Sequence, residues 1–186
     1  RAHEKWWPVF VRRSGRGLPA DVARTGQLLG TARGGILRHL FSDEPIALVH
    51  GDFTAGNLMF GWATETPLAV VDWQFLKPGR GVWDVACFLA TGVLPTVRRA
   101  IEAELLRDYV RILSDHGVGG YSVADAMHDY RLSLLNRLGT AISTIAAMPF
   151  SEHLQRLQVE EVLPLVVAAV QDHDCGALLD GELRRR

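Results

Sequence analysis

The chain has 186 residues, 48% of them hydrophobic and 22% charged, a composition typical of a globular domain with a buried core rather than of a disordered segment. Its formal net charge of -1 excludes a uniformly basic surface for nucleic acid or for an anionic membrane. No apolar run approaches the roughly 20 residues that span a bilayer, and the first residues lack the apolar core of a signal peptide. We therefore expect a cytoplasmic protein that acts on small molecules, with no nucleic-acid or membrane partner.

The first long element predicted is a helix over residues 21–41, where apolar side chains recur at roughly helical intervals. Asp21 is its expected N-cap. Glycines at 26, 30, 34 and 35 weaken the helix, but their spacing matches neither GxGxxG nor GxxxxGK[ST]. This mismatch favours a helix of low propensity over a phosphate-binding loop.

Three short apolar runs follow, at residues 46–50, 57–60 and 67–74. Each has the length and the Val, Leu, Ile or Phe content of a strand, and residues 61–66 between the last two have the composition of a turn. The pattern predicts one short strand followed by a β-hairpin.

Beyond Gly81 the sequence becomes helical, with helices expected at 82–92, 95–117, 122–148 and 151–171. Ser122 and Ser151 stand where helices begin, and Pro164 is expected to bend or interrupt the last helix. The third helix carries one continuous apolar face, which indicates core packing rather than a cofactor site. That face consists of Val123, Met127, Tyr130, Leu134, Leu138, Ala141 and Ile145.

Several polar residues have a plain structural interpretation. Cys87 and Cys175 lack a CxxC partner and are expected to be reduced core thiols, and the histidines show no zinc-binding spacing. Arg98 and Arg99 are typical of a solvated helix face. Asp125 and Asp129 share one helical face, which either holds a cationic substrate or is a solvated surface.

The chemically informative residues are Asp52, Asn57 and Asp72, which stand at the ends of the predicted strands. Phosphoryl transfer needs one carboxylate to orient the attacking hydroxyl and oxygen ligands for the magnesium ion that bridges the ATP phosphates. The five positions from Asp52 to Asn57 equal the Asp-to-Asn interval of the protein-kinase catalytic loop. Either residue alone is more typical of a turn, but the joint spacing with Asp72 favours a catalytic site.

The segments HGDFTAGNLMF at 50–60, VVDWQ at 70–74 and GRGVWDVACFL at 79–89 resemble the aminoglycoside phosphotransferase and choline kinase family. Gln74 resembles the DFQ or DWQ variant of its ecdysteroid-kinase-like branch. The resemblance implies the protein-kinase-like fold, here an α+β and mostly α-helical C-terminal lobe with a small β-hairpin at the catalytic edge. It also implies Mg2+ and ATP as cofactor and phosphoryl donor.

The same resemblance implies a role for five residues. Asp52 becomes the catalytic base, and Asn57 and Asp72 become the magnesium ligands. His50 supports the catalytic loop from within, and Asp84 braces it from the following helix.

Members of this family also carry an N-terminal lobe with a β-sheet and a strand lysine that pairs with ATP phosphates. Only 49 residues precede His50, they are expected to be helical, and the two lysines, Lys5 and Lys77, are not placed for that role. We therefore expect residues 1–186 to be the catalytic lobe of a longer protein, without the nucleotide-clamping lobe and inactive alone.

The expected function is ATP-dependent phosphoryl transfer to a hydroxyl group of a small molecule. A non-catalytic pseudokinase or binding module is the alternative that follows from the missing lobe. Metal-assisted hydrolysis, in which the same carboxylates act on water, is a third. The sequence does not distinguish sugar, aminoglycoside, choline, steroid or other alcohols as acceptor.

Overall fold

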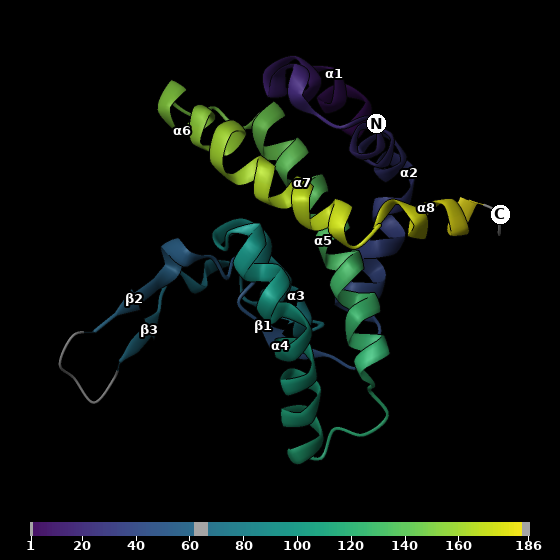
Figure 1. Cartoon of the computed structure of the whole chain (residues 1–186), viewed down its shortest axis with the longest axis vertical. Coiled ribbons are helices and arrows are strands. Elements are labelled where there is room, and N and C mark those ends of the chain that lie inside the picture. The colour runs from purple at the N-terminus through teal and green to yellow at the C-terminus, as the bar shows by residue number, and fades with distance from the viewer. Residues whose placement is uncertain (1, 62–66, 184–186) are drawn as a thin grey trace.

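The computed structural model describes residues 2–61 and 67–183, and they are mostly helical (Figure 1). The helices are α1 (Ala2–Ser14), α2 (Ala20–Ser42), α3 (Val82–Gly92), α4 (Pro95–Asp115), α5 (Val123–Ala147), α6 (Glu152–Leu157), α7 (Leu163–Asp172) and α8 (Gly176–Leu183). The strands are β1 (Ala47–Val49), β2 (Leu58–Phe60), β3 (Leu68–Val70) and β4 (Lys77–Gly79). The predicted α+β, mostly helical class is confirmed. Within the described ranges, every helix is too short or too polar to cross a lipid bilayer.

Helix α5 lies at the centre of the core and contacts α1, α2, α3, α4 and α7. Its predicted apolar face is buried from Tyr130 to Ile145, whereas Val123 at its start is 40% exposed. The helix begins as expected at Ser122, whose side chain and that of Asp125 form a reciprocal capping box. Burial of this face against five helices makes α5 a central part of the hydrophobic core.

Helix α2 forms over the predicted residues, but the prediction that Asp21 is its N-cap was wrong. The helix begins one residue earlier, at Ala20, with Pro19 in the cap position. The Asp21 carboxylate accepts hydrogen bonds from Gln171 Nε2 instead, at 3.0 and 3.2 Å. Gly26 lies inside the helix where a Cβ atom would stand 2.5 Å from the Trp7 ring, so this glycine lets α1 approach closely.

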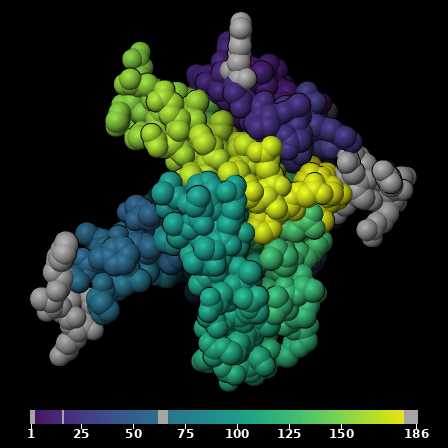
Figure 2. Space-filling view, in the orientation of Figure 1, coloured from purple at the N-terminus to yellow at the C-terminus, as the bar shows by residue number. Residues whose placement is uncertain are grey.

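The predicted β-hairpin is formed by β2 and β3, paired antiparallel with Leu58 opposite Val70. The hairpin projects from the helical body (Figures 1 and 2). Residues 62–66 of its expected turn lie outside the part of the chain that the structure describes. Strand β1 is also confirmed, and it pairs antiparallel with β4, which the sequence did not predict. Pro78 and Gly79 explain the omission, because both residue types are depleted in strands.

The last predicted helix is interrupted at Pro164, as expected. Residues Gln158–Val162 form a π-helical turn between α6 and α7, and Pro164 lies in the first turn of α7. Proline lacks the backbone N–H that would continue the α-helical hydrogen-bond ladder. The expected N-cap at Ser151 is confirmed, since its side chain accepts from the Leu154 amide.

The expectation of a solvated face at Arg98 was wrong. Arg98 is 1% exposed, donates to Glu102 Oε2 at 2.6 Å and also contacts Asp172 at the end of α7. Arg99 is half exposed and donates to the same Asp172. The pairs with Asp172 form because α4 packs against α7, which brings Arg98 next to a residue 74 positions later in the chain. The two cysteines are free and buried as predicted, and burial raises the pKa of the Cys87 thiol to about 11.

Candidate active site

The candidate site begins with a sharp turn at Gly51, two residues after the end of strand β1. Gly51 has a φ of 85°, and a Cβ atom there would stand 2.4 Å from the Phe75 carbonyl oxygen. Only glycine fits this left-handed conformation and this close approach without strain. The turn directs the following residue, Asp52, away from the strand.

Helix α3 anchors this turn through Asp84 in its first turn. One carboxylate oxygen of Asp84 accepts from the His50 amide at 2.7 Å, and the other accepts from the Gly51 amide at 3.1 Å. Burial raises the pKa of the Asp84 carboxyl, and the two backbone N–H groups oppose that rise by stabilising the carboxylate. The indole of Trp83 adds a third contact, donating to the Gly51 carbonyl at 3.4 Å.

Asn57 faces Asp52 across the loop that follows. Its Nδ2 donates to the Asp52 carbonyl oxygen at 2.8 Å and lies 3.4 Å from the Asp52 carboxylate atom Oδ2. Because Nδ2 is used in this way, the amide oxygen Oδ1 is the atom that Asn57 can offer to a ligand. Both side chains are half-buried.

Asp72 is brought next to Asn57 by the hairpin. The Val71 amide donates to the Asn57 carbonyl oxygen at 3.0 Å, which extends the β2–β3 ladder to the residue before Asp72. Asp72 has a φ of 65° and a ψ of 56°, a left-handed conformation that is uncommon outside glycine. Its side chain is exposed, and among the described residues no group forms a hydrogen bond or ion pair with its carboxylate.

His50 joins the loop to this hairpin strand. Its Nδ1 accepts from the Asp52 amide at 3.3 Å, so its Nε2 carries the hydrogen and donates to the Val71 carbonyl at 2.9 Å. The ring is 3% exposed and packs against Trp73 at a centroid distance of 4.7 Å. One imidazole thereby fixes the distance between the Asp52 loop and the strand that ends at Asp72.

The structure thus brings together all five residues singled out from the sequence. Each one belongs to the loop after β1, to the β2–β3 hairpin or to the start of α3. Sequence reasoning did not single out Trp73, which packs on His50, or Trp83, which donates to the Gly51 carbonyl. Their places directly after Asp72 and directly before Asp84 are the signal that could have found them.

The donor set suits a magnesium ion. Asn57 and Asp72 offer an amide oxygen and a carboxylate, the hard oxygen ligands that Mg2+ prefers, and such sites are completed by water and by substrate phosphates. Within the described ranges, no three His, Cys, Asp or Glu side chains gather in a way that would hold a metal by themselves. A site with two protein ligands therefore fits a cation that arrives with a nucleotide better than it fits a permanently bound structural metal.

Lys77 lies on β4, and its side chain packs against aromatic rings. Its ammonium stands 4.1 Å from the centroid of the Phe41 ring and 5.6 Å from that of Trp83. Burial lowers the pKa of Lys77, while the charge of Asp84 opposes that change. These contacts give Lys77 a packing role beneath the loop.

A comparison with protein-family models agrees with this geometry. The model described as the phosphotransferase enzyme family, APH, matches residues 6–126, about two thirds of the chain. The chain belongs to this aminoglycoside-phosphotransferase-like family. The match includes the loop, the hairpin and α3, so all five candidate residues of this phosphotransferase-family chain lie inside it. No curated protein and no solved structure gave a significant match.

Proposed function

We propose that this phosphotransferase-family chain transfers the γ-phosphoryl group of ATP to a hydroxyl group of a small molecule. Asp52 is the catalytic base, Asn57 and Asp72 hold Mg2+, and His50 and Asp84 support the loop. A bound magnesium ion would neutralise the charge that develops on the phosphate oxygens.

The chain's own residues carry out the rest of the reaction. Asp52 accepts a hydrogen bond from the acceptor hydroxyl and aims its oxygen at the γ-phosphorus. As that oxygen–phosphorus bond forms and the bond to the ADP oxygen breaks, the hydroxyl proton passes to the Asp52 carboxylate. Asn57 holds the backbone carbonyl of Asp52 through Nδ2, so the base and one metal ligand keep a fixed separation.

One observation carries this proposal: two independent tethers converge on the loop that bears Asp52. Asp84 binds the loop at the His50 and Gly51 amides, and the imidazole of His50 binds it to the strand before Asp72. Preorganised positioning of this kind is the main contribution that a protein makes to phosphoryl transfer. A loop that served only as a turn would not need both tethers.

We further propose that the chain is the catalytic lobe and that a β-rich lobe, of the kind this family uses to cover the nucleotide, packs on the β2–β3 side. Support comes from large apolar side chains that are between 51% and 72% exposed around the site: Leu48, Met59, Phe60, Trp73 and Phe75. Solvent exposure of so much apolar area in one region is typical of a surface that another unit covers. Gln74 favours the ecdysteroid-kinase-like branch within the family.

The proposal is tested by product analysis on the protein that includes the nucleotide-covering lobe. The protein is incubated with Mg2+, ATP and panels of sugars, aminoglycosides, amino alcohols and steroid alcohols, and phosphorylated products are sought by mass spectrometry. A phosphate monoester of one alcohol class supports the kinase. Free phosphate without an alcohol product supports metal-assisted hydrolysis, and intact ATP with tight nucleotide binding supports the binding module.

A further inference from the structure

The peptide group between Gly51 and Asp52 is held at both of its polar atoms. Its carbonyl oxygen accepts from the indole Nε1 of Trp83 at 3.4 Å, and its N–H donates to Nδ1 of His50 at 3.3 Å. Because a peptide group is planar, its orientation sets ψ of Gly51 and φ of Asp52 together. The direction in which the Asp52 side chain leaves the backbone therefore depends on this one plane.

Glycine at position 51 makes this plane free to turn unless other groups hold it. Gly51 has a φ of 85°, and glycine populates positive and negative φ about equally, so its own backbone gives little resistance to rotation. The Asp84 carboxylate binds the amides of His50 and Gly51, which both precede the Gly51 Cα atom. The peptide that follows Gly51 is thus left to Trp83 and His50.

The Trp83 indole is packed by side chains from three different elements. It is 3% exposed, and the Phe41 ring at the end of α2 meets it edge to face at a centroid distance of 5.2 Å. The Lys77 ammonium on β4 and the Arg137 guanidinium on α5 lie 5.6 and 5.9 Å from the centre of its ring. Edge-to-face and cation–π contacts each favour one orientation of the ring. The indole N–H therefore keeps a fixed direction.

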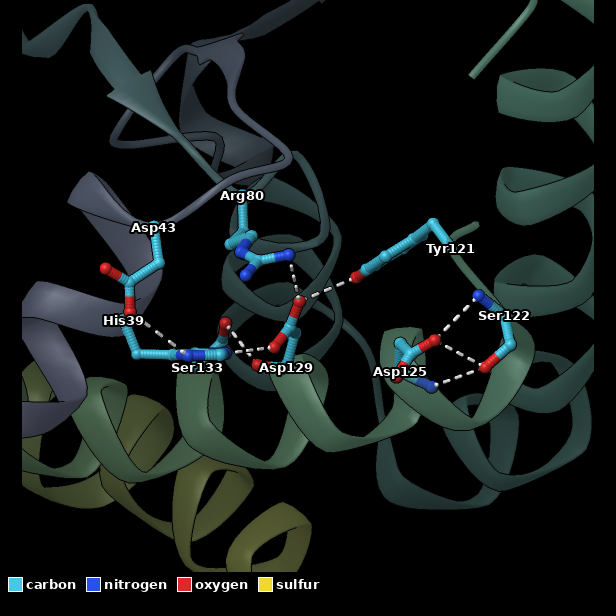
Figure 3. Close-up of polar contacts among 8 residues, drawn as sticks. All are labelled: His39, Asp43, Arg80, Tyr121, Ser122, Asp125, Asp129 and Ser133. Atoms are coloured by element: carbon cyan, nitrogen blue, oxygen red, sulfur yellow. Dashed lines mark hydrogen bonds and ion pairs between the residues drawn. The ribbon is translucent and has the colours of Figure 1, made fainter. Parts of the chain in front are cut away.

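The backbone that leads into Trp83 is anchored through Arg80. The Arg80 amide donates to the Leu40 carbonyl at 2.7 Å, and the Arg80 carbonyl accepts from the Trp83 amide at 2.9 Å. The Arg80 guanidinium forms an ion pair with Asp129 on α5, with 3.4 Å between Nη1 and Oδ2 (Figure 3). The start of α3 is thereby fixed to both α2 and α5.

Asp129 is itself held by two further side chains. Nε2 of His39 lies 2.6 Å from its Oδ1, and the Tyr121 hydroxyl donates to its Oδ2 at 2.8 Å (Figure 3). The expectation of a possible solvated face was wrong for Asp129, which is 2% exposed, whereas Asp125 is exposed and caps α5 through Ser122. Trp83 thus begins from a backbone position that the core keeps in place.

We propose that the Trp83 N–H is a positioning donor for phosphoryl transfer, which holds the Gly51–Asp52 peptide in the orientation that aims the Asp52 carboxylate. This inference rests on the proposed role of Asp52 as the base. Trp83 acts through the loop backbone and not on the substrate. Without its N–H, the peptide turns about Gly51 and a smaller fraction of molecules presents Asp52 in the reactive direction. The hairpin keeps its own hydrogen bonds, so the loss falls on turnover rather than on nucleotide binding.

The first test reads the loop backbone without any reaction. Amide hydrogen exchange in the 186-residue chain is measured by NMR for the wild type and for Trp83→Phe, which keeps an aromatic ring but has no N–H. The Asp52 amide should exchange about three- to tenfold faster in the variant, as expected for the loss of one hydrogen bond. The Tyr130 amide, at a fully buried position of α5, reports global unfolding and serves as the reference. An unchanged Asp52 rate, or equal acceleration at Asp52 and Tyr130, would overturn the proposal.

A second replacement separates the N–H from the shape of the ring. Benzothienylalanine at position 83 exchanges the indole N–H for sulfur and keeps the bicyclic ring, so this protein should fold even if Trp83→Phe does not. It should show the same faster exchange at Asp52. Wild-type exchange at Asp52 in this protein would show that the packing of the ring, and not the N–H, holds the peptide.

The third test measures turnover in a protein that includes the proposed nucleotide-covering lobe. Trp83→Phe should lower kcat about three- to tenfold and leave KM for ATP within about twofold of the wild type. The matched control is Trp7→Phe on α1, which packs on α2 and α5 and should lose stability without a loss of kcat. An unchanged kcat in Trp83→Phe, or an equal loss in the control, would overturn the positioning role. No transfer by the wild type would instead reject the proposed function, and the hydrogen-exchange result would still decide whether Trp83 holds the peptide.

Discussion

The Asp84 carboxylate accepts the backbone N–H of His50 at 2.7 Å, across 34 positions of the chain. The second oxygen of the same carboxylate accepts the next amide, at Gly51. A single side chain on α3 thereby fixes the entry into the loop that carries Asp52. The loop owes its conformation to a helix that follows it in sequence, so its rigidity depends on the packing of α3 in the core.

Replacing Asp84 with alanine should lower the free energy of unfolding by about 2 to 4 kcal/mol, because two buried or half-buried amides lose their acceptor. The measurement is urea denaturation followed by circular dichroism. The matched control is Asp108→Ala on α4, whose carboxylate is half exposed and pairs with Arg111 on the surface. We expect that control to change stability by under about 0.5 kcal/mol. Equal stability losses in the two variants would show that Asp84 is not an anchor.

Two glycines of α2 should respond to alanine with opposite signs. Gly34 has open space around the position of a Cβ atom, so Gly34→Ala should stabilise the helix by about 1 kcal/mol. Gly26→Ala would place its Cβ 2.5 Å from the Trp7 ring and should destabilise the protein by about 1 to 3 kcal/mol despite the same gain in helix propensity. Thermal unfolding of both variants checks the pair, and a higher midpoint for Gly26→Ala would contradict the close packing of α1 on α2.

The Arg98, Arg99 and Asp172 cluster should make stability depend on acid pH. Hydrogen bonds from Arg99 and then Arg98 hold the pKa of Asp172 below its usual value, although partial burial opposes them. A lowered pKa in the folded state contributes stability above the unfolded pKa of about 3.9, and that stability is lost as pH falls through the folded pKa. Asp172→Asn should therefore show a shallower loss of unfolding free energy than the wild type as the pH falls below about 4. Parallel curves for the two proteins would contradict this origin of the acid sensitivity.

Local patterns in the sequence predicted much of this structure. The Asp52-to-Asn57 spacing, the hairpin runs and the serine caps at Ser122 and Ser151 each depend on residues within a few positions of one another. Such patterns act through periodicity and backbone geometry, which a single sequence records directly.

The errors and omissions concern contacts between distant segments. Strand β4 has no strand composition, and it exists because Lys77–Gly79 finds β1 as a partner. Arg98 was expected on a solvated face, but helix packing pairs it with Asp172, and Asp129 was expected on a possible solvated face but pairs with Arg80, 49 positions away. Pairing of this kind leaves no periodic signal in the chain, so it could not be read from residue order.

The most direct test of the central claim separates nucleotide binding from turnover at Asp52 and Asp72. In a protein that includes the proposed nucleotide-covering lobe, Asp52→Asn should retain the affinity for Mg2+-ATP but lose roughly 100- to 10,000-fold in phosphoryl transfer to the acceptor. Asp72→Ala should lose both the transfer and most of the Mg2+-dependent ATP affinity, because the proposed metal ligand is removed. Asp43→Asn, at the exposed end of α2, serves as the control. Phosphoryl transfer at the wild-type rate in Asp52→Asn, or unchanged Mg2+-dependent affinity in Asp72→Ala, would contradict the assigned roles.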